Sequence, residues 1–128
     1  MEKKIINSEK AFAAVGPYSH SVVLSGAPTM QYTSGQIGAC PKSGKLKETV
    51  EEQTVQAFAN LEAILNEAGM DFDNVVKTTV FLKNMSDFAA VNKIYAGYFP
   101  ADPPARSCVA AAELPLGALF EIEAIAAR

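Results

Sequence analysis

Apolar residues recur at helical spacing through one long stretch in the first half of the chain. From Val50 to Ala68 they repeat every three or four residues, and Gly69 follows. Thr49 and Glu52 match a capping box, in which a hydroxyl and a carboxylate satisfy free backbone N–H groups at a helix start. Glycine is a common residue just past a helix end. This stretch therefore predicts a helix that begins after Thr49 and ends at Ala68.

A second, shorter helix is predicted before Pro100. Ser86 is of a residue type that caps helix starts, and proline cannot continue a helix. Between them, one apolar stripe at helical spacing consists of Phe88, Val91, Tyr95 and Tyr98.

The other apolar segments have the pattern of strands. Turn signals separate several of them, among them Gly26-Ala27-Pro28 and Leu114-Pro115-Leu116-Gly117. Residues 74–82 are apolar and β-branched on both alternating faces, which is typical of a strand covered on both sides. The predicted strands are residues 21–25, 30–35, 74–82, 105–113 and 118–127.

This order of elements predicts one α/β domain over residues 1–128, a common domain size. Each helix follows a strand and precedes one, and right-handed crossovers place both helices on the same face of a mixed sheet. The opposite face then stays uncovered. Because so large an exposed apolar face is unusual in a monomer, the pattern favours self-association.

Composition narrows the classes of function. The net charge of −3 and the pI near 5.1 argue against nucleic acid as the main partner, since such binding rests on neutralising phosphates. One histidine and two cysteines without CxxC spacing argue against zinc. No apolar run is long enough to span a membrane, and the N-terminus lacks the features of a signal peptide. We expect a cytoplasmic protein.

Arg106 is the first candidate for chemistry. Alternation along its strand places it on one face with Cys108 and Ala110. A guanidinium among small side chains needs a partner, because an unpaired buried charge is costly. Two interpretations stay open: an ion pair with Glu121 or Glu123 on a neighbouring strand, or a bidentate contact with the carboxylate of a ligand.

Glu121 and Glu123 project from one face of the last strand, where two carboxylates could serve proton transfer. Glu123 fits a solvated strand face, and we favour a site role for Glu121. Tyr18 follows a rigid Gly-Pro pair and is either a packing residue or a site residue. Gly35 lets another group approach the backbone closely.

Five segments occur in a fixed order along the chain: Gly16–His20, Thr33–Ile37, Val76–Phe81, Pro104–Val109 and Glu121–Ala126. Together they closely resemble the reactive intermediate deaminase family, also called the Rid or YjgF family. The resemblance runs from about Ile5 to the C-terminus without a large insertion.

The resemblance implies a chorismate-mutase-like single domain with a mixed six-stranded sheet and two helices on one face. It also implies a homotrimer with a central barrel and with ligand sites between subunits. The implied reaction is hydrolysis of 2-imino acids, such as 2-iminopropanoate and 2-iminobutanoate, to the 2-keto acid and ammonia. It needs no metal or organic cofactor.

By the same resemblance, Arg106 binds the substrate carboxylate, and Glu121 positions or activates water at the imine. The other implied site residues are Tyr18, Ser34, Gly35, Asn92 and Cys108. Many relatives have an acidic residue where Ala110 stands and a lysine where Leu116 stands. These departures bear on substrate preference.

Two other functions stay open. Some relatives have been described as endoribonucleases or translation inhibitors, although the acidic charge and single histidine of this chain argue against that activity. A non-catalytic regulator that senses small carboxylates is the third possibility, because a binding pocket and a catalytic one look alike in sequence.

Overall fold

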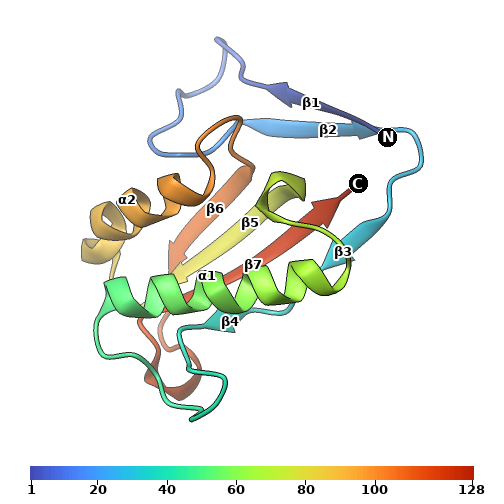
Figure 1. Cartoon of the computed structure of the whole chain (residues 1–128). Coiled ribbons are helices and arrows are strands. Elements are labelled where there is room, and N and C mark those ends of the chain that lie inside the picture. Colours follow the sequence, from blue (N-terminus) through green and yellow to red (C-terminus); the bar gives the residue numbers. More distant parts are fainter.

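The computed structural model describes residues 1–128 and consists of two layers (Figure 1). Helices α1 (Val50–Glu67) and α2 (Phe88–Tyr98) cover one face of a mixed sheet. The strands of this sheet lie in the order β3 (Met30–Tyr32), β7 (Phe120–Ala127), β5 (Val75–Leu82) and β6 (Ala105–Ala110), and β4 (Gln36–Ile37) also pairs with β7. Strands β5 and β6 are parallel, and the other pairs are antiparallel. The predicted α/β class, with both helices on one face, is confirmed.

The predicted count of six strands in one sheet is wrong. Strands β1 (Glu2–Ile6) and β2 (Ser21–Ser25) form a separate antiparallel hairpin beside the five-stranded sheet. The strand predicted over residues 30–35 is interrupted after Tyr32. There, Thr33 donates its N–H to the Ala124 carbonyl at 2.9 Å, and its hydroxyl accepts the Ala124 N–H at 3.0 Å. The strand predicted over 105–113 ends at Ala110.

The first helix agrees with its prediction. Thr49 accepts the Glu52 N–H at 3.1 Å, and its hydroxyl donates to the Glu52 carboxylate at 3.0 Å. The carboxylate therefore binds the capping hydroxyl, and only one direction of the predicted capping box forms. At the other end, Gly69 has a φ of +69°, and the Met70 N–H reaches the Leu65 carbonyl at 3.0 Å.

The predicted cap of the second helix is wrong. Ser86 lies inside a 3-10 turn, Met85–Asp87, and α2 begins at Phe88 without a side-chain cap. The helix ends at Tyr98, two residues before Pro100, as the sequence predicts.

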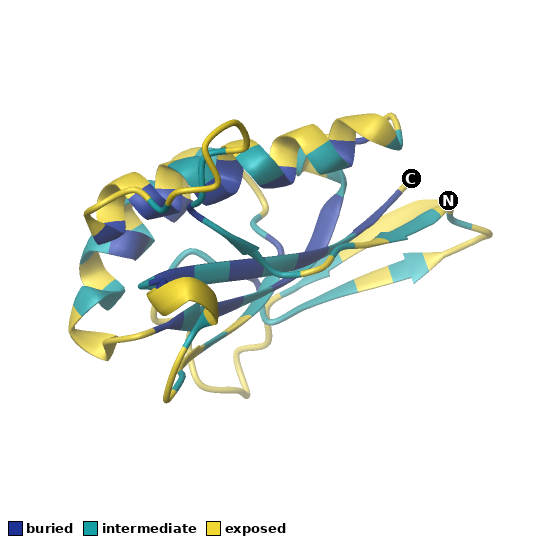
Figure 2. Ribbon diagram, turned by 90° about the horizontal axis from the view of Figure 1, so that it is seen from below, coloured by how far each residue is buried: buried dark blue, intermediate teal, exposed yellow.

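The core lies between the helices and the sheet. Figure 2 shows buried residues on the inner sides of both layers, and exposed residues on the outer sides of the helices. Aromatic rings from both helices meet at Phe58, which stacks on Tyr98 with ring centroids 4.0 Å apart. On the opposite face of the sheet, Tyr32 and Val109 remain 70% and 47% exposed. The predicted uncovered face is confirmed.

Candidate active site

Strand register assigns the candidate residues to two different faces of the sheet. Residues that pair directly across neighbouring strands project to the same face. Thr78 is buried under the helices and pairs with Arg106 on β6, so Arg106 lies on the helix-covered face. Phe81, three residues later on β5, pairs with Glu121 on β7 and projects to the uncovered face. Glu121 therefore projects from the face opposite to Arg106.

This arrangement overturns one of the two interpretations of Arg106. Strand β5 separates β6 from β7, so Glu121 and Glu123 are not on a strand adjacent to Arg106. The predicted ion pair with either glutamate is wrong. Instead, Arg106 Nη1 donates to the neutral amide oxygen of Asn92 on α2 at 2.7 Å.

Aromatic rings surround the half-buried guanidinium of Arg106. Its central carbon lies 4.8 Å from the centroid of Tyr95, 5.5 Å from that of Phe88 and 5.6 Å from that of Tyr18. Cations over aromatic faces are attracted by the ring quadrupole. The rings and the Asn92 amide together fix the position of the guanidinium and leave the remaining N–H donors without a hydrogen-bond partner in the chain.

Two neighbours keep this arrangement in place. The Tyr95 hydroxyl forms a 2.7 Å hydrogen bond with Thr78, and burial raises the pKa of Tyr95 to about 12, so this ring stays neutral. On the other side, a Cβ added at Gly16 would lie 2.9 Å from Arg106 Nη2. A side chain at Gly16 would therefore displace the guanidinium.

Cys108 lies on the same face as Arg106, where it pairs with Val80 and packs against the core. Burial raises the pKa of the Cys108 thiol, and the nearby Arg106 charge lowers it by less. The thiol is therefore protonated at neutral pH. A protonated thiol is a poor nucleophile, because the thiolate is the reactive form.

The uncovered face brings Glu121 against the loop between β3 and β4. Gly35 is packed so closely on this carboxylate that an added Cβ would lie 2.8 Å from Glu121 Cδ. Partial burial, followed by the charge of Glu123, raises the pKa of Glu121. Ser34 is exposed next to this contact. The structure thus brings Gly35 together with Glu121, and Tyr18 and Asn92 together with Arg106.

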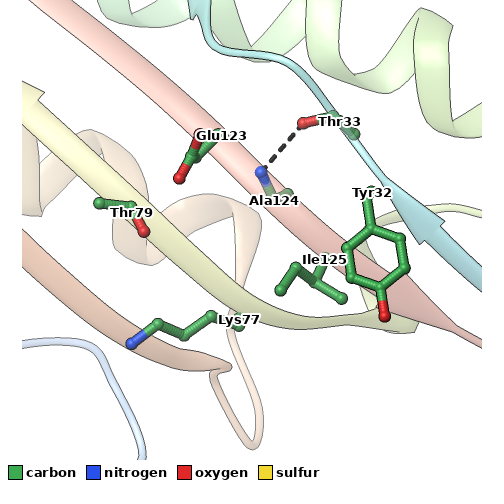
Figure 3. A pocket seen from close by; sticks show the side chains of 7 residues that line it. All are labelled: Tyr32, Thr33, Lys77, Thr79, Glu123, Ala124 and Ile125. Atoms are coloured by element: carbon green, nitrogen blue, oxygen red, sulfur yellow. Dashed lines mark hydrogen bonds between the residues drawn. The ribbon is translucent and has the colours of Figure 1, made fainter.

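A hollow of about 200 Å³ lies farther along the uncovered face (Figure 3). The figure shows side chains from β3, β5 and β7 around it. Of the candidate residues, it contains only Glu123, together with Tyr32, Thr33, Lys77, Thr79, Ala124 and Ile125. No group of three or more His, Cys, Asp or Glu side chains could hold a metal ion.

The sequence pattern does not predict that three residues lie next to Arg106. The stripe that includes Phe88 and Tyr95 predicts only helix positions, although both rings also face the guanidinium. The Gly16-Pro17 pair predicts only a rigid loop. Gly16 is the available signal, because glycine is common where another group approaches the backbone closely.

Comparison with known proteins identifies the family. The family model described as endoribonuclease L-PSP matches residues 8–128. The chain belongs to the L-PSP family, also called Rid or YjgF. The mouse 2-iminobutanoate/2-iminopropanoate deaminase is 49% identical over 127 residues, which cover 98% of this chain and 92% of the mouse protein. The resemblance drawn from the five sequence segments is confirmed.

Two solved structures place the fold in the same family. YyfB of Yersinia pestis, a protein of the conserved Rid family, is 33% identical with a TM-score of 0.87 over the full length of both chains. E. coli TdcF, solved with bound serine, is 41% identical with a TM-score of 0.75 over 98% of each chain. Neither α1 nor α2 of this Rid-family chain combines the length and the apolar character that crossing a membrane requires.

Proposed function

We propose that this protein hydrolyses small 2-imino acids to 2-keto acids and ammonia. The observation that carries the proposal is the environment of Arg106, whose fork is oriented by three rings and one amide and has donors free for a ligand carboxylate. Family membership and the name of the mouse relative supply the reaction class. The serine bound to E. coli TdcF is itself a small carboxylate.

The carboxylate end of the site consists of Arg106 with three supporting residues. Two N–H donors of one guanidinium edge form a bidentate contact with a planar carboxylate. Asn92 holds Nη1, Gly16 leaves room for Nη2, and Tyr18 closes the site beside the guanidinium. In this arrangement Asn92 acts on the substrate through Arg106.

The imine end of the site consists of Glu121 with Gly35 and Ser34. A substrate of three or four carbons cannot reach through a sheet from Arg106 to Glu121. We therefore propose a homotrimer in which Arg106 of one copy faces Glu121 of another across the interface. The uncovered face, with exposed Tyr32 and Val109, supports burial against further copies.

The reaction proceeds by addition of water to the carbon of the imine. The imine enters protonated on its nitrogen. Glu121, as a carboxylate, accepts a proton from the attacking water while the new C–O bond forms and the C=N π electrons return to nitrogen, which gives a neutral carbinolamine. Glu121 then passes this proton to the nitrogen and, as the C–N bond breaks and ammonia leaves, takes the proton of the hydroxyl while the C=O bond forms. The protonated Cys108 thiol packs against its neighbours or polarises the substrate, and it forms no covalent bond to the substrate. Positioning and modest proton transfer suffice for so reactive a compound.

RNA cleavage is the second candidate, because the matching family model carries the description of an endoribonuclease. Two features argue against it. The net charge is −3, and the single histidine, His20, has both ring nitrogens engaged with the backbone of the chain.

We also propose a cytoplasmic location and no requirement for a cofactor.

A paired assay tests the proposal. A threonine dehydratase generates 2-iminobutanoate in situ, and the release of ammonia is followed with and without this protein. In parallel, structured and single-stranded RNA are incubated with the same preparation across a range of salt. We expect faster ammonia release and intact RNA. Ammonia release at the uncatalysed rate would contradict the proposal, and RNA cleavage that is lost in Arg106→Ala would favour the second candidate.

A further inference from the structure

The segment from Ser8 to Val15 connects the β1–β2 hairpin to the carboxylate end of the proposed site. All of its residues are exposed, and Phe12 and Val15 keep 78% and 60% of their surface in solvent. Its internal hydrogen bonds are two local contacts from Ala11 and Lys10 to Ser8. The segment therefore has little packing that could hold it in one position.

The His20 side chain joins the first half of this segment to the rest of the protein. The Ser8 N–H donates to His20 Nδ1 at 2.9 Å, and His20 Nε2 lies 2.7 Å from the Phe12 carbonyl oxygen. The backbone N–H of His20 also binds the Asn7 side chain at 3.0 Å. His20 precedes β2, so the ring connects the beginning and the middle of the exposed segment to the start of a strand.

The hydrogen-bond partners determine the tautomer of the ring. A backbone N–H can only donate, so Nδ1 of His20 must accept and carries no proton. A carbonyl oxygen can only accept, so Nε2 must carry the proton. A second proton on the ring would bind to Nδ1 and point at the Ser8 N–H. Two hydrogen-bond donors would then meet, and the hydrogen bond between Ser8 and His20 would be lost. The two observed hydrogen bonds of the ring, to Ser8 and to Phe12, therefore require a neutral His20.

The segment held by His20 continues directly into the site. The Val15 N–H donates to the Tyr18 hydroxyl at 3.3 Å, and Tyr18 lies over the Arg106 guanidinium. Gly16 is next to Val15 and leaves the space that Arg106 Nη2 occupies. A displacement of the segment therefore moves groups that contact Arg106 directly.

We propose that His20 is a pH-dependent positioning residue of the carboxylate site. The neutral ring holds the segment and with it Gly16 and Tyr18 against Arg106, and protonation of the ring releases them. Histidine is the side chain that ordinarily changes charge between about pH 5 and pH 8. Glu9 is the only charged side chain lining the hollow of about 280 Å³ beside His20, so its carboxylate is the group to control for. The proposal rests on the proposed function of Arg106.

A measurement without substrate tests whether His20 holds the segment from Ser8 to Val15. The chain has no tryptophan, and the exposed Phe12 tolerates one, so Phe12→Trp provides a single fluorescent reporter on the segment. We expect its emission to change between about pH 8 and pH 5 in a sigmoidal transition. Adding His20→Gln should abolish this transition, because glutamine does not titrate, whereas adding Glu9→Gln should retain it. An emission that is flat with the native histidine, or a transition that survives His20→Gln, would overturn the proposal.

Kinetics then test the link to the site. For 2-iminobutanoate, the ratio of KM in His20→Gln to KM in the native protein should be above one at pH 8 and fall toward one at pH 5. We expect about three- to tenfold at pH 8, the range for loss of one neutral hydrogen bond, with kcat changed less. A constant ratio together with a clear transition in the fluorescence of the Phe12→Trp reporter would refute the link to the site. Inactivity of both proteins alongside that transition would count against the proposed function alone.

Discussion

Replacing Arg106 removes the group on which the proposed function depends most. In the proposed site, Arg106→Ala removes the charge-assisted and bidentate partner of the substrate carboxylate. The guanidinium is half-buried among Tyr18, Phe88 and Tyr95, so water replaces it poorly. Loss of such a contact typically costs about 2–5 kcal/mol. We expect kcat/KM for 2-iminobutanoate to fall roughly 30- to several-thousand-fold, at about 1.4 kcal/mol per tenfold.

Three further variants separate the effect of charge from the effect of geometry. Arg106→Lys should restore little activity, because an ammonium lacks the planar fork that the surrounding rings and Asn92 orient. Asn92→Asp keeps an acceptor for Nη1 but adds a negative charge beside the position of the substrate carboxylate. If Arg106 binds that carboxylate, Asn92→Asp should raise KM more than Asn92→Ala does. If Arg106 is only structural, the added ion pair should leave KM unchanged.

The assay is steady-state release of ammonia, with circular dichroism and thermal unfolding on each variant, because Arg106 also packs against the rings. A folded Arg106→Ala protein with unchanged kcat/KM would refute the carboxylate contact, and most of the functional proposal with it.

Three other predictions follow from the uncovered face. Gly35→Ala should lower kcat about tenfold or more by displacing Glu121, because a rise of about 1.4 kcal/mol in the activation free energy slows a reaction tenfold. Gly97→Ala is the control and should leave kcat unchanged, because open space surrounds Gly97. Activity that needs the Glu121 carboxylate should fall as the pH drops through the raised pKa of Glu121. Glu123→Gln removes a like charge and should shift this fall to lower pH. An unshifted pH profile would show that the charge of Glu123 does not raise the pKa of Glu121. Sedimentation equilibrium should give about three times the 13.6 kDa chain mass, and a stable monomer would contradict the shared site.

The sequence predicts the helices well because their signals are local. In α1, the apolar stripe that includes Phe58 and Leu61, the Thr49 cap and the Gly69 stop all lie within one stretch of chain. Strand β1 was missed for the converse reason. Its residues EKKII include a Lys pair on a two-stranded hairpin that has little core to cover, so no alternation marks it. The start of α2 was misplaced because a capping residue type, Ser86, occurs inside a turn.

Alternation also predicts which residues share a face within one strand. Arg106 and Cys108 do lie on one face of β6, and Glu121 and Glu123 on one face of β7. Alternation contains no information on which strands are neighbours. That order depends on crossovers and on packing of the whole chain, which put β5 between β6 and β7. The ion pair predicted for Arg106 failed at this step.

The failure of that ion pair is itself informative about function. An arginine paired with Glu121 would have its fork occupied and its charge compensated within the chain. Arg106 has instead a neutral amide as its hydrogen-bond partner, and it lies half-buried among aromatic rings. Keeping a partly desolvated charge without a counter-ion costs free energy. Such a local cost is expected at functional sites, where a ligand supplies what the fold omits. In the proposed function, a carboxylate substrate supplies the missing charge at Arg106, and in the proposed homotrimer the carboxylate of Glu121 on another copy of the chain stays free for water.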